Sequence, residues 1–399
     1  MNKKVSLGTA LSIIILVVAV TFATTFVISM NFFNSKIKNL NERENMFQKV
    51  QEIDSVVRNN FYDDITEKDL INSICSGYVA GLSDKYSYYM TAEQYNRLKQ
   101  NNSGSLVGIG IVISKDPSGY FKIESVYKDS PAEAVGLLSE DLIVKIGDED
   151  TAALTLEGMT ERINGEIGTK VKLTVRTSGE QKELEVVRRK IEIPSVEYKS
   201  IGYFGYIRIT EFNAATVAQF KNALSEVTKA GNTGIVFDVR NNTGGTLDAT
   251  CQILDELLPE GPIVSAMYKD STEKTVLYTS GSGEVRIPMT VLVNENTASA
   301  AELFACALKD YDKAYVVGST TYGKGVMQTT YQLSDGSAVI ITTGKFYPPK
   351  SDNFNEVGVK PNYDVALSPD QSANLSKLDE TNDPQLIKAM EVLASENNK

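Results

Sequence analysis

The sequence predicts an α/β domain with a largely parallel sheet and an inserted small β-rich domain, together with an N-terminal helical region and one N-terminal apolar helix. Three observations support this fold class. From about residue 205, short apolar runs alternate with helical stretches, as in a parallel sheet covered by helices. Between about residues 103 and 190, short alternating runs are separated by turn residues. Near the N-terminus, no charged residue occurs between Lys4 and Lys36.

The length and composition suggest several domains. With 399 residues, of which 42% are hydrophobic, the chain can form two or three cores. We expect a transmembrane anchor (residues 1–35), a helical stalk and cap (36–102), the β-rich domain (103–190), the α/β core (191–365) and a C-terminal tail with a final helix (366–399). The formal charge of −11 repels nucleic acid, so no nucleic-acid partner is expected.

The apolar segment over residues 7–28 is long enough to span a bilayer, which needs about 20 apolar residues. A cleaved signal peptide is the alternative. Its apolar region would be shorter, and no convincing small-x-small cleavage site precedes Asn31. Basic residues on both sides leave the orientation undecided by charge. Because N-terminal anchors most often export the rest of the chain, we expect a single-pass protein of the cell membrane with the domains after the anchor on the extracytoplasmic side.

The region after the anchor is polar and has apolar residues at helical spacing. These residues are Ile37, Leu40, Met46, Val50, Ile53, Val56 and Val57. Such amphipathic stretches often pair with a second copy, so a homo-oligomer is one expectation. Packing against the chain's own domain explains the pattern equally well.

Three segments of the α/β domain fall where strands of a parallel sheet end, and such edges commonly carry sites. Residues 241–245 form a glycine turn that opens a helix and can supply backbone N–H donors. Residues 294–299 lead into a helix whose N-terminus favours negative charge. Residues 323–325 precede a stretch that alternates like a strand.

The chain contains no histidine. A Ser-His-Asp relay, a His-ligated zinc site and a histidine base are therefore excluded. Lysine can replace histidine if burial lowers its pKa, so Lys324 is a candidate base for Ser299. Gln328 lies four residues after Lys324 and faces the same side of a strand. The two would be about 13 Å apart along a straight strand, so a bend at the glycines that flank Lys324 is needed for Gln328 to steady the amine.

The same patterns have other interpretations. Ser299 and Glu302 fit the Ser-x-x-Glu capping box of an ordinary helix start. Residues 318–324 nearly match a phosphate-binding loop, but Gly325 stands where that loop requires Ser or Thr. Ser271 and Lys274 form a Ser-x-x-Lys pattern, yet the Lys-Thr-Gly that should accompany it is absent.

The β-rich domain resembles a PDZ domain. The resemblance rests on residues 108–111 at the start of a strand and on Ser-Pro-Ala-Glu-x-x-Gly-Leu at residues 130–137. It implies that backbone amides of this first segment hold the C-terminal carboxylate of a peptide, which adds a strand beside residues 109–113. The implied peptide-binding residues are Gly108, Ile109, Gly110 and Ile111.

Four motifs, with the PDZ-like domain between the first and second, resemble carboxyl-terminal processing peptidases of the tail-specific serine protease family. They are residues 81–87 (Gly-Leu-Ser-Asp-Lys-Tyr-Ser), 238–245, 297–302 and 323–328. The resemblance covers nearly everything from residue 50 onward. It implies a crotonase-like protease core that needs no metal or other cofactor. The implied roles are Ser299 as nucleophile, Lys324 as base, Gln328 as orienting residue, and amides of Gly244 or Gly245 and of Ala300 as oxyanion donors.

The sequence thus predicts a membrane-anchored serine endopeptidase that cleaves polypeptides recognised by their apolar C-terminal tails. The alternative is a catalytically idle, membrane-tethered PDZ adaptor, which replacement of Ser299 or Lys324 would favour; neither is replaced. An acyl-CoA enzyme would leave the peptide-binding domain unexplained. One departure concerns control: Asn164 stands where related peptidases commonly carry arginine. Weaker coupling between peptide binding and catalysis is expected unless Arg162 substitutes.

Overall fold

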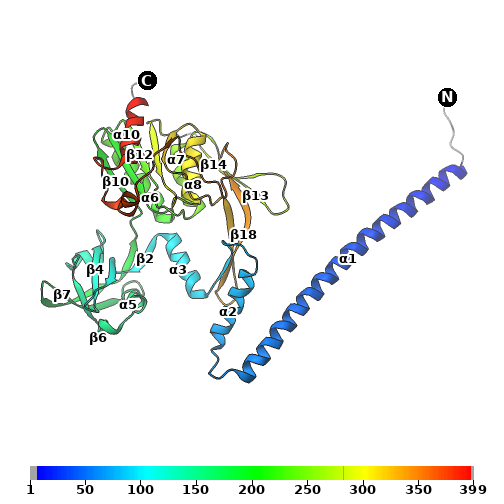
Figure 1. Ribbon diagram of the computed structural model, residues 1–399, viewed down its shortest axis with the longest axis horizontal. Coiled ribbons are helices and arrows are strands. Elements are labelled where there is room, and N and C mark those ends of the chain that lie inside the picture. The colour runs from blue at the N-terminus through cyan, green and yellow to red at the C-terminus, as the bar shows by residue number, and fades with distance from the viewer. Residues whose placement is uncertain (1–6, 282, 397–399) are drawn as a thin grey trace. The chain divides into compact units, whose positions relative to one another are not determined.

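One long helix carries the N-terminal apolar segment. In the computed structural model, which describes residues 7–281 and 283–396, helix α1 runs from Leu7 to Asn60 without interruption (Figure 1). Its segment Leu11–Met30 is long and apolar enough to cross a membrane. The hydroxyls of Thr21 and Thr24 donate to carbonyls one turn earlier, so these polar groups are satisfied within the helix. The chain divides into two compact units, residues 1–74 and 75–399.

The central sheet of the second unit is largely parallel, as predicted. Its six strands follow the order β10-β11-β12-β15-β16-β19, and only the pair β10–β11 is antiparallel. The strands are β10 (Val196–Ile201), β11 (Phe204–Ile209), β12 (Gly234–Asp238), β15 (Met289–Val293), β16 (Ala314–Gly318) and β19 (Tyr363–Asp364). Every residue of β12 and β15 is buried, as expected for strands covered on both faces.

Helices cover both faces of this sheet (Figure 1). On one face, α6 (Ala214–Lys229), α7 (Leu247–Leu257) and α8 (Ala300–Asp310) enclose the main apolar core. On the other face, α10 (Pro384–Glu396) packs through Leu386, Ala389 and Leu393 against Val236 and Leu292. The short α9 (Pro369–Ala373) precedes α10 in the C-terminal segment.

A second, antiparallel sheet lies beside the first in the same unit. It consists of β1 (Tyr88–Met90), β13 (Gly261–Tyr268), β14 (Thr275–Ser280), β17 (Val326–Gln332) and β18 (Ala338–Tyr347). Strand β1 departs from the prediction, which has this region helical throughout; α2 (Glu67–Ala80) and α3 (Ala92–Ser103) flank it. It pairs with β18, Tyr88 opposite Ile340, and so fixes the residues just before it close to β17 and β18.

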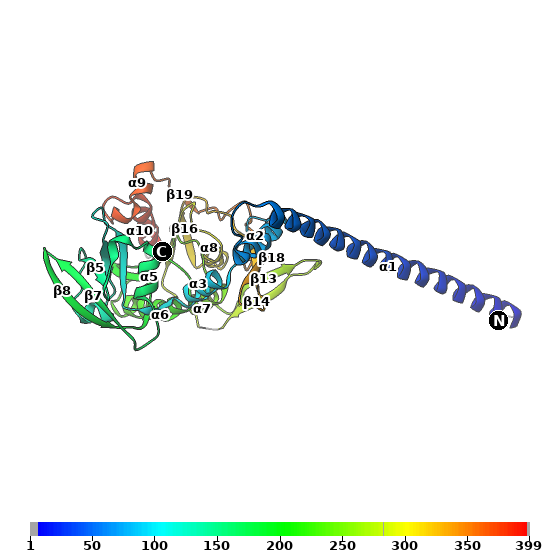
Figure 2. The same ribbon diagram turned by 90° about the horizontal axis from the view of Figure 1, so that it is seen from below.

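The β-rich domain has its own sheet and core. The sheet order is β3-β4-β5-β7-β8, and Figure 2 shows β7 and β8 as its long final hairpin. The elements are β2 (Ser105–Gly108), β3 (Ile111–Lys115), β4 (Phe121–Val126), α4 (Pro131–Ala134), β5 (Leu142–Ile146), β6 (Glu149–Asp150), α5 (Leu156–Ile163), β7 (Lys170–Thr177), β8 (Glu180–Val187) and β9 (Arg189–Glu192). Strand β3 lies at the sheet's edge and therefore offers a free side to an added strand.

Candidate active site

Ser299 lies at the turn between β15 and α8. Its backbone angles, φ 57° and ψ −116°, fall in a region that residues with a side chain rarely adopt. The residue is half-buried, whereas Ala300 and Ala301 behind it are buried. A strained strand-to-helix turn is a known means of presenting a nucleophilic serine hydroxyl.

The carboxylate of Glu302 connects the nucleophile segment to the lysine segment. Oε2 accepts the backbone N–H groups of Ser299 and Lys324, each at 2.8 Å. Oε1 accepts Gly323 N–H at 2.6 Å and the Thr321 hydroxyl at 2.5 Å. Glu302 is fully buried, which raises its pKa, while these donors act in the opposite direction. The glutamate of the Ser-x-x-Glu pattern therefore joins the nucleophile and lysine segments, in addition to its place in the first turn of α8.

The glycine turn 241–245 packs directly against the nucleophile. A Cβ atom on Gly244 would lie 3.0 Å from Ser299 Cβ and 3.1 Å from Ala300 N. The Gly244 N–H donates to Asn242 Oδ1 at 2.8 Å. Among the residues that the structure describes, no acceptor takes the N–H of Gly245 or of Ala300.

The amine of Lys324 is partly buried. Burial lowers its pKa from the ordinary lysine value of 10.5, and nearby Lys85 acts in the same direction. The carboxylates of Asp84 and Glu302 act to raise it. The amine also lies 4.8 Å from the centre of the Tyr86 ring. Because the pKa of Lys324 falls overall, its amine becomes neutral, as a base must be, at a lower pH than a lysine in water.

The segment 84–87 forms one wall of this site, and sequence reasoning gives it no role. Asp84 accepts the Ser87 hydroxyl at 2.5 Å, and Ser87 Oγ accepts Thr342 N–H at 3.0 Å. The Tyr86 hydroxyl is buried, and Lys85 and Tyr322 approach it without hydrogen-bond geometry. The signal is the motif at residues 81–87, which supports the family resemblance but does not by itself indicate a chemical role.

Gln328 reaches the lysine only through other residues. It lies on β17 where the pairing with β18 is irregular, between Met327 and Gln328. Its Nε2 donates to Thr342 Oγ1 at 3.1 Å, the Thr342 N–H donates to Ser87 Oγ, and Ser87 donates to Asp84, whose carboxylate acts on the Lys324 amine. Within the described residues, no hydrogen bond joins Gln328 to Lys324. The sequence predicts a bend at the glycines that flank Lys324, whereas the irregularity in strand pairing lies between Met327 and Gln328.

The predicted peptide-binding residues lie together at the edge of the β-rich domain. Gly108 ends β2, Ile109 is fully buried and Ile111 begins the edge strand β3. Gly110 has a φ of 85°, and any side chain there would collide with Ser130. The carbonyls of Ile109 and Gly110 accept Ala132 and Tyr127 N–H groups, each at 2.9 Å.

The side chain of Arg162 is directed away from the position of Asn164. Its Nε and Nη2 donate to Glu149 at 2.7 and 3.1 Å, and Nη1 donates to Gly158 O. Asn164 is the C-cap residue directly after α5, and its side chain faces Gly108. Arg188 instead binds this region, donating to the carbonyls of residues 162, 163 and 170. Arg162 is therefore engaged elsewhere in the domain.

Residues 7–281 and 283–396 contain no group of three or more His, Cys, Asp or Glu residues arranged to hold a metal ion. The chemistry available at the site is that of a serine hydroxyl, an amine, backbone amides and a buried carboxylate.

Three family models match the chain: "Peptidase family S41" over residues 203–365, "PDZ domain" over 122–177 and "Activating protease CtpB N-terminal domain" over 15–94. A Staphylococcus aureus protein (strain bovine RF122 / ET3-1) named "Probable CtpA-like serine protease" is 34% identical over 368 residues, 92% of this chain and 74% of the relative. A Staphylococcus haemolyticus protein of the same name is 32% identical, covering 95% and 77%.

Two solved structures are also similar to the chain. The photosystem II D1 C-terminal processing protease is 26% identical with a TM-score of 0.47, covering 79% of this chain and 86% of that one. A Bacteroides fragilis chain described as an S41 protease is 18% identical with a TM-score of 0.50, covering 84% and 91%, and this likeness shows a shared fold.

Together with the fold, these matches define a serine-type peptidase that carries a PDZ domain. The chain belongs to peptidase family S41 and is similar to CtpA-like serine proteases over most of its length. The alternative of an idle adaptor is not favoured.

Proposed function

We propose that the protein is a membrane-anchored serine endopeptidase with a Ser299–Lys324 dyad in a crotonase-like core. It cleaves polypeptides whose apolar C-terminal tails are bound by the PDZ domain. The observation that carries this proposal is the shared carboxylate oxygen of Glu302. Oε2 accepts the backbone N–H groups of both Ser299 and Lys324, each at 2.8 Å. One oxygen atom therefore holds the nucleophile segment and the base segment next to each other.

In the proposed reaction, neutral Lys324 takes the Ser299 proton and the serine oxygen attacks the peptide carbonyl. Lys324 then gives the proton to the leaving amine, and water hydrolyses the acyl-enzyme by the same steps in reverse. Asp84 and Tyr86 shape the surroundings of the amine, and Gln328 acts on it through Thr342, Ser87 and Asp84. No metal or organic cofactor takes part.

The oxyanion donors are the N–H groups of Ala300 and of the glycine turn. Since the Gly244 N–H already donates to Asn242, the free Gly245 N–H is the better candidate, with Gly244 as the close-packed support. Donors of this kind act strongly because they are in place before charge develops.

Substrate selection is assigned to residues 108–111 and to the free side of β3. The amides there would receive a terminal carboxylate, and the peptide would extend the sheet by one strand. The apolar segment of α1 anchors the protein, with the catalytic part on the extracytoplasmic side and a second copy as a candidate partner of the helical region.

Mass-spectrometric detection of cleavage of an unstructured protein with an apolar C-terminus tests the proposal. Ser299→Ala and Lys324→Ala should each lose at least about 10³-fold in rate while remaining folded. A serine-directed fluorophosphonate should label the wild type but not Ser299→Ala. The matched controls are Ser271→Ala and Lys274→Ala, both exposed on the β13–β14 hairpin, which should retain activity. Near-normal turnover by Ser299→Ala or Lys324→Ala would refute the dyad.

A further inference from the structure

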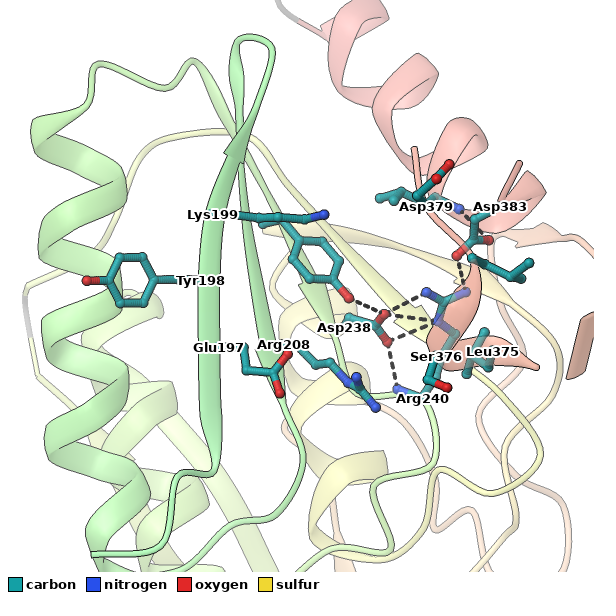
Figure 3. A pocket seen from close by; sticks show the side chains of 13 residues that line it. Glu197, Tyr198, Lys199, Arg208, Asp238, Arg240, Leu375, Ser376, Asp379 and Asp383 are labelled. Carbon is teal, nitrogen blue, oxygen red and sulfur yellow. Dashed lines mark hydrogen bonds and ion pairs between the residues drawn. The ribbon is translucent and has the colours of Figure 1, made fainter. Parts of the chain in front are cut away.

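A buried charge network joins the C-terminal segment to the end of strand β12. Arg240 pairs with Asp238 at 2.6 Å and with Asp383 at 2.8 Å, and these side chains are at most 4% exposed. Its Nη1 also donates to Gln385 Oε1 at 2.9 Å. Figure 3 shows Arg240 between Asp238 and Asp383, beside a cavity of about 270 Å³. Two residues of the C-terminal segment therefore fix the guanidinium.

The composition of the network indicates a geometric role. Two carboxylates face one guanidinium in the interior, and the Tyr206 hydroxyl donates to Asp238 at 2.7 Å. Burial acts to raise the pKa of Asp238, but Arg240 holds it below its usual range. Buried ionic groups often stabilise a fold no better than apolar packing would, whereas a fully bonded network fixes one arrangement.

Arg240 leads directly into the glycine turn. The next residue, Asn241, donates its N–H to Asn294 Oδ1 at 2.9 Å. Asn242 then binds Gly244 N–H through its side chain and Ala298 N–H through its carbonyl at 3.0 Å. A continuous path of bonded residues thus runs from the guanidinium to the residue before Ser299.

We propose that Asp383 and Gln385 are positioning residues of the catalytic site. They hold Arg240 and, through it, the turn 241–245. Because this turn carries the proposed oxyanion donors, the inference rests on the proposed function. Both residues lie outside residues 203–365, the part matched by the S41 model. The peptidase core is therefore complete only with its C-terminal segment docked.

The two oxygens of Asp383 allow a selective variant. Oδ1 accepts the N–H groups of Gln385 and Leu386 at the start of α10, whereas Oδ2 pairs with Arg240. Asp383→Asn retains the helix cap and loses the acceptor for Arg240. Gln385→Met is a second variant of similar length without an acceptor. Leu393→Ala is the control, because Leu393 lies on the same helix as Gln385 and is fully buried in the apolar cluster against the sheet.

The experiment uses the full-length protein and measures kcat and KM for a reporter peptide, affinity for a peptide boronic acid, and thermal unfolding by circular dichroism. A boronic acid forms a tetrahedral adduct with serine and so reports on the oxyanion site. Displacing the turn by about 1 Å can cost up to about 100-fold. Asp383→Asn and Gln385→Met should each reduce kcat and boronate affinity more than about fivefold, with KM unchanged.

Leu393→Ala should retain kcat although its unfolding temperature falls. Losses below fivefold in both network variants would overturn the positioning role, as would an equal loss in Leu393→Ala. If Asp383→Asn does not fold, Gln385→Met decides alone. A wild-type protein that does not cleave the reporter would instead refute the proposed function.

Discussion

Replacement of Gly244 by alanine tests how closely the glycine turn is fitted to the nucleophile. Gly244 has a φ of 109°, and a Cβ there would lie 2.9 Å from Ala298 O, 3.0 Å from Ser299 Cβ and 3.1 Å from Ala300 N. Comfortable contacts between carbon atoms are about 3.5–4.0 Å. The turn or the start of α8 must therefore move apart by roughly 0.5–1 Å.

A shift of this size acts on the atoms that the mechanism uses. Misplacement by about 1 Å can cost about 100-fold in rate, and loss of one oxyanion donor about 10²–10³-fold. Gly244→Ala should therefore lower kcat by about 10²-fold or more and leave KM for a PDZ-bound substrate nearly unchanged. The assay is steady-state cleavage of a reporter peptide, with the rate of fluorophosphonate labelling of Ser299 as a second measure.

Gly231→Ala is the matched control. Gly231 also has a positive φ, 75°, but nothing lies within 4 Å of an added Cβ. The control therefore carries the backbone strain, about 1 kcal/mol, without the collision. It should lose stability but not activity. A folded Gly244→Ala variant with near wild-type kcat would refute the idea that the turn is held against Ser299.

Further predictions concern the base and the PDZ domain. Activity should rise with pH as Lys324 loses its proton, at a pH below the ordinary lysine pKa of 10.5. Asp84→Asn removes a carboxylate that raises the pKa of Lys324, so in this variant the rise should occur at lower pH. An Asp84→Asn variant with an unchanged pH–rate profile would contradict the role of Asp84. Amidating the C-terminus of a substrate should reduce cleavage, because the charge that residues 108–111 would receive is lost; equal cleavage of amidated and free peptides would exclude the PDZ domain as selector. The wild-type protein should show substantial activity with the PDZ domain empty, since Arg162 is engaged with Glu149. Asn164→Arg should increase the activation caused by a PDZ-binding peptide. Strong activation of equal size in the wild type and in Asn164→Arg would show that position 164 is not the coupling element.

Much of the α/β fold could be predicted because its signals are local. Runs such as residues 234–238 and 289–293 are apolar throughout, which is typical of central parallel strands, and the glycine and serine segments come directly after them. The three segments expected at strand ends are indeed brought together around Glu302 and Gly244.

The remaining parts of the site depend on contacts between distant residues. Asp84 and Tyr86 lie near Lys324 because β1 pairs with β18, about 250 residues later in the chain, and no local pattern encodes that pairing. The irregular pairing before Gln328 and the network of Asp383 with Arg240 are likewise set by tertiary packing. The short strand Tyr88–Met90 is not predicted, because the residues before it have helical spacing. Its two tyrosines favour extended structure.

The uninterrupted course of α1 has a consequence for reach. Its 54 residues correspond to roughly 80 Å at about 1.5 Å per residue. A bilayer core takes up about 30 Å of that length, and the residues beyond Met30 extend the same helix by roughly 45 Å. A continuous helix is a stiff spacer, unlike a flexible linker of equal length. Anchored as proposed, the end of this helix at Asn60 lies a fixed length, roughly 45 Å along the helix axis, beyond the end of the membrane-spanning segment.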